Sequence, residues 1–151
     1  MAGAAASDAI PAGTDSLSAY LREIGRIRPP TSREERALID RIARGDESAR
    51  IALIAAHLKL VISICRQFRD QGLPFADLVG EGNLGLVRAA RSFGATHARR
   101  FAGYAEWWIR NRIRNALEEQ ARFLASPGAR PAARRAPERR RLSPDPKRGF
   151  A

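Results

Sequence analysis

The spacing of apolar residues constrains the fold of this chain more than any other feature of its sequence. Between residues 17 and 124 they recur every three or four positions, which is the period of an α-helix, and the strict alternation typical of a β-strand is absent. Glycines, prolines and capping residues divide this region into separate helical segments. The pattern predicts an all-α bundle with one core.

The first half of the chain contains three predicted helices. Residues 17–24 form one apolar face and end before a pair of prolines. Thr31 followed by Glu34 has the spacing of a capping box, which predicts the start of a second helix. Asp46 is an N-cap residue for a third segment, which we expect to continue as one long helix until Gly72 closes it.

The second half contains two more predicted helices. One begins at Pro74 and has apolar residues as far as Phe93, with three glycines that weaken a helix but permit close packing. The other runs from about Phe101 to Leu124. No continuous apolar stretch approaches the ~20 residues that a membrane-spanning helix needs, so we expect no membrane association.

Composition divides the chain into three parts. Residues 1–14 are Ala-rich without the features of a signal peptide, residues 15–124 form the helical domain, and residues 125–151 combine Pro with Arg. Such a basic tail cannot build a core, and we expect it and the leader to be disordered. The formal net charge of +11 favours a polyanionic partner, with nucleic acid as the first candidate.

Residues that carry metal, redox or catalytic chemistry are scarce. Cys65 is the only cysteine and lies in an apolar helical pattern, and the two histidines, His57 and His97, have no neighbours at ligand spacing. We therefore expect no disulfide, metal or cofactor, and a cytoplasmic location. No nucleophile and base are suitably spaced, so the chain is predicted not to be an enzyme.

The last helix has two chemically distinct faces when its residues are placed at about 100° per position. The face expected to be buried is aliphatic and consists of Ala105, Ile109, Ile113, Ala116 and Leu117. The opposite face, expected to be partly exposed, has Tyr104, Trp107, Asn111 and Arg114, with Trp108 and Asn115 at its border. Aromatic side chains interspersed with Arg and Asn favour binding to single-stranded DNA, because aromatic rings stack on bases and cations bind phosphates. In the alternative interpretation, the tryptophans cap the rim of the core.

Three motifs resemble the sigma-70 family of bacterial transcription initiation factors. The sequence YAEWWIR at residues 104–110 is similar to the family's YAxWWIR signature, and EGNLGL at residues 81–86 is similar to its EGNxGL core-polymerase-binding motif. YLREIG at residues 20–25 resembles the helical stretch that precedes them. The motifs occur in the family's order between about Asp15 and Arg122, and the resemblance fades near Phe123.

The resemblance implies two sets of site residues. The residues implied to face the clamp helices of the polymerase's largest subunit are Asp77, Leu78, Glu81 and Asn83. Those implied to bind the minus-ten promoter element, mainly its non-template single strand, are Phe93, Arg99, Arg100, Phe101, Tyr104, Trp107, Trp108, Arg110, Asn111 and Arg114. Asp77 and Glu81 are also one helical turn apart, so a basic partner or plain solvent would suit their carboxylates.

Departures from the family pattern leave several functions open. Asn111 and Arg114 replace the Gln and Thr usual in housekeeping members, which leaves the preferred upstream bases unspecified. His57 resembles the form found in heat-shock-type members, but a single histidine on a helix is more often a packing residue. Because the matched region lacks the downstream sigma domains, the chain is expected to be a minimal sigma factor, a non-initiating competitor or remnant at the sigma site, or a nonspecific DNA-binding protein.

Overall fold

The computed structural model describes residues 12–94 and 100–125. Throughout these residues the chain forms helices joined by turns, without a strand, which confirms the all-α prediction. The helices are α2 (Ala12–Gly25), α3 (Ser32–Ala43), α4 (Glu47–Ala56), α5 (Leu58–Arg66), α6 (Phe75–Ser92) and α7 (Phe101–Ala125). Most of the predicted leader and tail lies outside the described residues.

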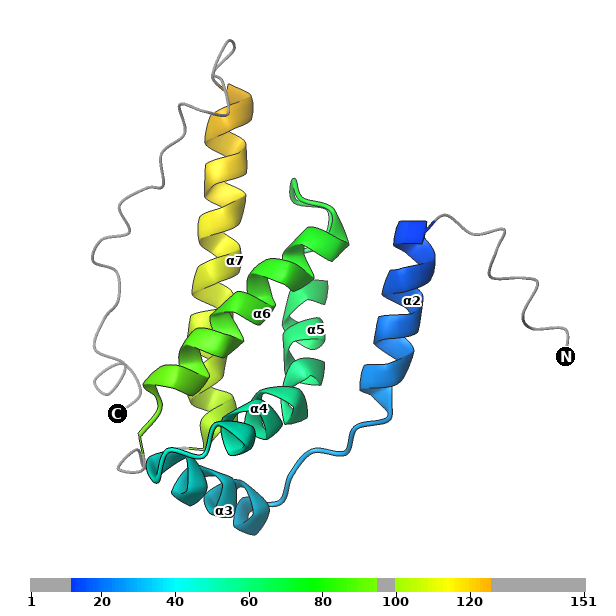
Figure 1. Cartoon of the computed structure of the whole chain (residues 1–151). Coiled ribbons are helices and arrows are strands. Elements are labelled where there is room, and N and C mark those ends of the chain that lie inside the picture. Colours follow the sequence, from blue (N-terminus) through cyan, green and yellow to red (C-terminus); the bar gives the residue numbers. More distant parts are fainter. Residues whose placement is uncertain (1–11, 95–99, 126–151) are drawn as a thin grey trace, which may run out of the picture.

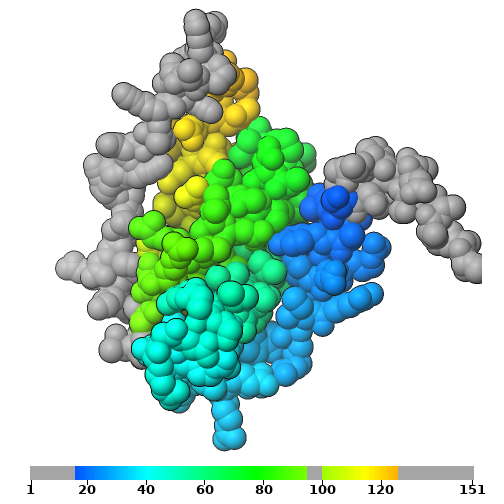
Figure 2. Space-filling model, in the orientation of Figure 1, coloured from blue at the N-terminus to red at the C-terminus, as the bar shows by residue number. Residues whose placement is uncertain are grey.

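The two longest helices, α6 and α7, cross each other and make the most extensive contact in the bundle (Figure 1). Helix α5 packs against both, α3 and α4 lie together at one end, and α2 rests against α5. The space-filling view in Figure 2 shows these N-terminal helices, in blue and cyan, meeting α6 in green. The core therefore lies between α5, α6 and α7.

Two glycines let α6 approach its neighbours closely, Gly85 on the side of α7 and Gly82 mainly on the side of α5. A Cβ added at Gly85 would lie 2.6 Å from the Trp108 carbonyl oxygen and 2.9 Å from the Ile109 Cα. At Gly82 an added Cβ would lie 2.7 Å from Val61 Cγ1. The backbone of α7 occupies the space that a side chain at Gly85 would need, so the helices meet backbone to backbone. The prediction that the glycines of α6 permit close packing is confirmed for Gly82 and Gly85, whereas nothing lies within 4 Å of a Cβ added at Gly80.

The prediction of one long helix between Asp46 and Gly72 is wrong, because the helix is interrupted at His57 and forms α4 and α5. The His57 Nδ1 lies 2.9 Å from the Leu53 carbonyl oxygen, the acceptor that the His57 backbone N–H would use in a continuous helix. That N–H donates instead to the Ile54 carbonyl, at 3.0 Å. The imidazole therefore competes with the helix ladder, and α5 begins one residue later.

The predicted starts of α3 and α4 are confirmed. The Thr31 hydroxyl accepts from the Glu34 backbone N–H at 3.1 Å, and the Glu34 carboxylate accepts from the Thr31 N–H at 2.9 Å. Asp46 accepts from the Ser48 and Ala49 backbone N–H groups. These side chains satisfy amides that have no partner inside their helices, which is why the helices begin there.

The segment Glu47–Arg66 meets the length and composition of a membrane span. The expectation that no apolar run approaches this length is therefore wrong. In the structure this segment is two helices, and its side chains Leu53, Val61 and Ile64 are buried in the core. A core helix of a soluble protein passes the same test, so packing inside the bundle accounts for its apolar composition.

Candidate functional site

Helix α7 presents its aliphatic face to the rest of the bundle, as predicted. Ala105, Ile109 and Ile113 have no exposed surface, whereas Ala116 and Leu117, further along the helix, are half-buried. Burial is complete where α6 crosses and decreases toward the C-terminus. The middle of α7 is therefore held against α6 on one side and open on the other.

The first turns of α7 contradict the predicted aromatic face. Phe101 is 0% exposed and Tyr104 is 2% exposed, so the expectation that Tyr104 lies on an exposed face is wrong. The Phe93 ring packs against both, with centroids 5.2 Å from Phe101 and 4.9 Å from Tyr104. The His57 ring meets Phe101 edge-on at 4.9 Å. Buried rings offer no face to a base, so in this conformation Phe101 and Tyr104 are core residues.

The reason is that the beginning of α7 is enclosed from more than one side. The projection at 100° per residue assumes one buried face, but here His57, at the break between α4 and α5, packs against this end in addition to the side chains that α6 provides. Because several elements surround this end of the helix, both of its aromatic side chains, Phe101 and Tyr104, are buried. Sequence periodicity alone cannot detect this, because the enclosing residues are distant in sequence.

The two tryptophans remain at the surface. Trp107 and Trp108 are half-buried and meet edge to face, with centroids 5.1 Å apart and an interplanar angle of 88°. The Arg88 guanidinium of α6 lies 5.3 Å from the Trp108 ring centroid, within cation–π distance. Arg88 was not among the predicted site residues, and the only sequence signal for it is its position two turns after Glu81 on α6.

The predicted basic residues have defined partners on the protein. Arg110 forms an ion pair with Glu106 at 2.9 Å and donates to Gln67 Oε1 at 3.0 Å. Arg114 lies with its Cζ 5.9 Å from the Phe68 ring centroid. Asn111 is half-buried between them on the same helix. These contacts hold the cations of the middle of α7 beside the two tryptophans.

Two arginines of the predicted DNA-binding set precede α7. Arg100 pairs with the buried carboxylate of Glu35, at 3.0 Å. Arg99 lies outside the described residues.

Helix α6 carries the predicted protein-binding residues, but they do not share one face. Asp77 is exposed and Glu81 is half-buried, whereas Leu78 is 0% exposed and belongs to the core. The prediction that Leu78 faces a partner is therefore contradicted, because the helix turns its side chain inward. The Asn83 amide donates to the Tyr20 hydroxyl at 3.1 Å and joins α6 to α2.

One exposed apolar residue on α6 escaped the sequence prediction. Leu84 is 49% exposed and lies three residues after Glu81 and seven after Asp77, so it continues the same stripe. Glu81 also forms an ion pair with Arg112 of α7, at 3.0 Å. The α6 stripe, defined as Asp77, Glu81 and Leu84, therefore combines two carboxylates with an apolar side chain.

The described residues contain no group of three or more His, Cys, Asp or Glu side chains placed to hold a metal ion. Cys65 is fully buried beneath α6, and burial raises the pKa of its thiol to about 11. A thiol of that pKa stays protonated at neutral pH and is a poor nucleophile. The chemistry available at the surface of the bundle is therefore that of rings, cations and carboxylates.

Comparison with known proteins gives two matches that together cover most of the helical region. Residues 53–123 match the family described as Sigma-70 region 2, and residues 15–48 match Sigma-70 factor, region 1.2. The RNA polymerase sigma factors SigA of Clostridium acetobutylicum and of Listeria monocytogenes are each 42% identical to the chain over 113 residues. That alignment covers 75% of this chain and 30% of each relative.

Proposed function

Because the chain belongs to the sigma-70 family of RNA polymerase sigma factors, we propose that it binds core RNA polymerase and helps to open the promoter minus-ten element. The chain spans about a third of the length of the curated relatives it matches. The proposal therefore concerns the steps that this part of a sigma factor performs. It assigns the protein to the bacterial cytoplasm and gives it no catalytic activity of its own.

The observation that carries the DNA part of the proposal is the half-buried pair of tryptophans on α7. Trp107 and Trp108 lie within one turn of Arg110, and Arg88 reaches the Trp108 ring from α6. Rings stack on bases of any sequence, and cations bind the phosphates between them. We assign the flipped non-template bases to this pair, with Asn111 on the flanking duplex.

The energetics require a polymerase partner. Unstacking duplex DNA costs about 1.4 kcal/mol per step, and each base stacked on an aromatic ring returns roughly 1–3 kcal/mol. With Phe101 and Tyr104 in the core, only three of the five implied rings, Phe93, Trp107 and Trp108, keep exposed surface. The chain should therefore capture bases that open within a polymerase complex instead of melting DNA alone.

The protein-binding part of the proposal rests on the α6 stripe. Asp77 and Glu81 offer carboxylates to a basic surface, and the exposed Leu84 adds the apolar contact that interfaces place between charged groups. The partner proposed for this stripe is the coiled-coil clamp helices of the largest polymerase subunit.

Charge reversal tests the proposed polymerase contact. The double substitution Asp77→Arg and Glu81→Arg should lower affinity for core polymerase at least tenfold, by about 1.4 kcal/mol or more, because like charges would then face each other. The matched control is Asp40→Arg with Glu118→Arg, which changes net charge equally at exposed positions of α3 and α7. Equal binding of core polymerase by both double variants, measured by biolayer interferometry or pull-down, would rule out the α6 stripe as the contact.

A second function is favoured by the burial of Phe101 and Tyr104. With few ring faces available, the chain would occupy the sigma site of core polymerase without starting transcription. Abortive transcription from a promoter with an extended minus-ten element separates the two functions. RNA synthesis by core plus this chain supports initiation, whereas competition against a complete sigma factor without RNA synthesis supports the competitor.

A further inference from the structure

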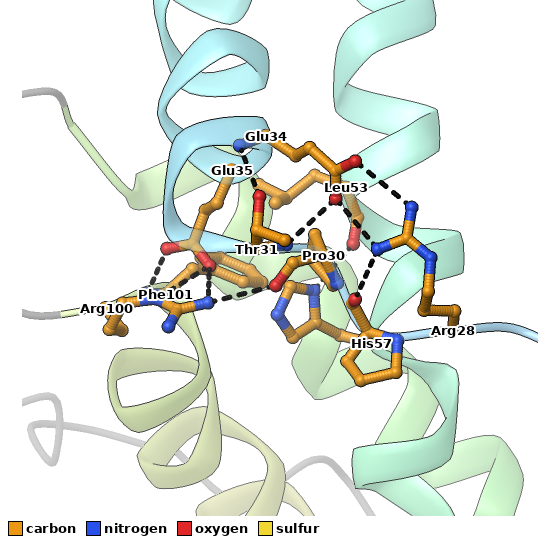
Figure 3. A network of polar contacts seen from close by, with 10 residues as sticks. Arg28, Pro30, Thr31, Glu34, Glu35, Leu53, His57, Arg100 and Phe101 are labelled. Atoms are coloured by element: carbon orange, nitrogen blue, oxygen red, sulfur yellow. Dashed lines mark hydrogen bonds and ion pairs between the residues drawn. The ribbon is translucent and has the colours of Figure 1, made fainter.

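A buried carboxylate joins α3 to the start of α7. The Glu35 side chain is 4% exposed, and Figure 3 shows its two oxygens directed at Arg100 and Phe101. One oxygen accepts from Arg100 Nε at 3.2 Å and from its Nη2 at 3.0 Å. The other accepts from the Phe101 backbone N–H at 2.8 Å. These contacts connect positions that are 65 and 66 residues apart in the sequence.

The contact with Phe101 replaces a local helix cap. Phe101 is the first residue of α7, and the first amides of a helix have no acceptor within it. Such amides are usually satisfied by a Ser, Thr, Asp or Asn side chain just before the helix. Here the acceptor is a carboxylate from another helix, whose negative charge also suits the positive end of the α7 dipole.

The surroundings of Glu35 make this cap rigid. Arg100 pairs with the carboxylate and also donates from Nη2 to the Pro30 carbonyl, at 3.4 Å, so the charge is compensated and the turn before α3 is included. On the other side, the His57 ring packs against Phe101 while its Nδ1 bonds to Leu53 (Figure 3). Glu35 of α3 and His57, between α4 and α5, therefore contact the first turn of α7 from two directions.

We propose that Glu35 is a positioning residue for the promoter-binding surface, because it fixes where α7 starts and orients Arg100 beside it. Trp107 lies six residues after Phe101, less than two turns along the same rigid helix. A change at the first turn is therefore transmitted to the tryptophan pair. The effect on DNA rests on the function proposed above, whereas the capping of α7 by Glu35 is a property of the protein alone.

Hydrogen exchange on the full-length protein tests the cap without any partner. Glu35→Ala should speed exchange of the first-turn amides of α7, residues 101–104, about tenfold, the equivalent of losing one helix cap. The matched control is Glu34→Ala on the same helix. Glu34 is exposed, caps α3 locally and pairs with Arg28, so its loss should leave the first turn of α7 protected.

DNA capture tests the consequence. A labelled non-template strand with the minus-ten sequence is titrated into core polymerase with each variant. Glu35→Ala should lower capture about tenfold while core binding stays unchanged, and Glu34→Ala should capture like the wild type. Glu35→Gln keeps an oxygen for the Phe101 amide, so it should recover part of both protection and capture.

Three results would overturn the proposal. The first is wild-type protection and capture in Glu35→Ala, and the second is an equal loss in Glu34→Ala. The third is loss of core binding together with DNA capture, which would indicate a general loss of structure. If Glu35→Ala does not fold, Glu35→Gln and Arg100→Ala test the proposal in its place. Each of these two variants must weaken DNA capture more than Glu34→Ala does. Failure of the wild type to capture DNA would refute the proposed function and leave the exchange test of the cap intact.

Discussion

Two stretches of α7 carry similar residues and use them differently. Its first turns place Phe101 and Tyr104 in the core, whereas Trp107 and Trp108, one turn later, are only half-buried. The first stretch is enclosed by α3, by His57 and by α6, and the second is packed mainly against α6. The difference shows that an aromatic residue in a signature motif can support a binding surface without belonging to it.

The largest expected effect separates a core ring from a surface ring. Tyr104→Ala should lower the free energy of unfolding by about 3–5 kcal/mol, because it removes a fully buried aromatic side chain. Trp107→Ala should lower it by about 1–2 kcal/mol, since Trp107 is only partly buried and already keeps some of its surface in water. Urea denaturation of both variants makes the comparison. Equal losses would mean that Trp107 is as much a core residue as Tyr104.

The next effect tests the close approach that holds the middle of α7. Gly85→Ala should destabilise the fold by about 1–3 kcal/mol, because the new Cβ would collide with the backbone of Trp108 and Ile109. Gly80→Ala is the matched control on α6, where nothing lies within 4 Å of an added Cβ. That substitution should stabilise the helix by up to about 1 kcal/mol. Thermal melting that ranks the two variants in the opposite order would refute the glycine crossing.

The buried cysteine gives an independent measure of the same crossing. Cys65 lies under Gly82, 3.4 Å from a Cβ added there, and its thiol has no exposed surface and a raised pKa. A thiol reagent should therefore react only when the α5–α6–α7 core opens. Labelling of Gly85→Ala should be faster than labelling of the wild type, and that of Gly80→Ala should not. Rapid labelling of the wild type at neutral pH would contradict the packing.

The smallest effect concerns the local caps at the surface. The Arg28 hydrogen bond, with the Thr31 amide, lowers the pKa of Glu34 from 4.5 to about 2. A hydrogen bond from Ser48, followed in size by one from Arg41, lowers the pKa of Asp46 from 3.8 to about 2. Both folded-state values lie below the unfolded ones, so each carboxylate stabilises the fold above the unfolded pKa, and this contribution is lost as pH falls toward 2.

An acid titration of stability checks these two caps. Glu34→Gln and Asp46→Asn should each lose less stability between pH 5 and about pH 2 than the wild type does, and salt should shrink the difference because both carboxylates are in contact with solvent. A steeper acid loss in either variant would show that its carboxylate has no favourable partner. The local caps would then differ from the buried Glu35 cap in kind as well as in size.

The sequence predicted most of the fold because helix signals are local. The capping box at Thr31, the N-cap at Asp46 and the apolar period depend on neighbours within a few residues, and all three are confirmed. The break at His57 was missed, since it depends on an imidazole reaching the Leu53 carbonyl and on the packing of that ring against Phe101. Nothing in the period of the segment indicates either contact.

The candidate site was predicted less completely than the fold. The helical projection put Trp107 on a partly exposed face and Trp108 at its border, and both are half-buried. Because the projection assigns one face to solvent along the whole helix, it also exposed Tyr104, which is buried. The prediction for Leu78 came from the family resemblance, which does not show which way a side chain of α6 points, and the structure places Leu78 in the core. Glu35 was not predicted at all, because its partners lie 65 and 66 residues away and no local pattern marks a cap supplied by another helix.

The most direct test of the account is the binding of a labelled non-template strand to core polymerase in the presence of this chain. The wild type should capture a strand carrying the minus-ten sequence, and Trp107→Ala should bind it at least fivefold more weakly, which corresponds to roughly 1 kcal/mol for one lost stack. Core binding should be the same for both proteins. Equal capture by the wild type and Trp107→Ala, or no capture by either, would contradict the assignment of the tryptophan pair to the open promoter strand.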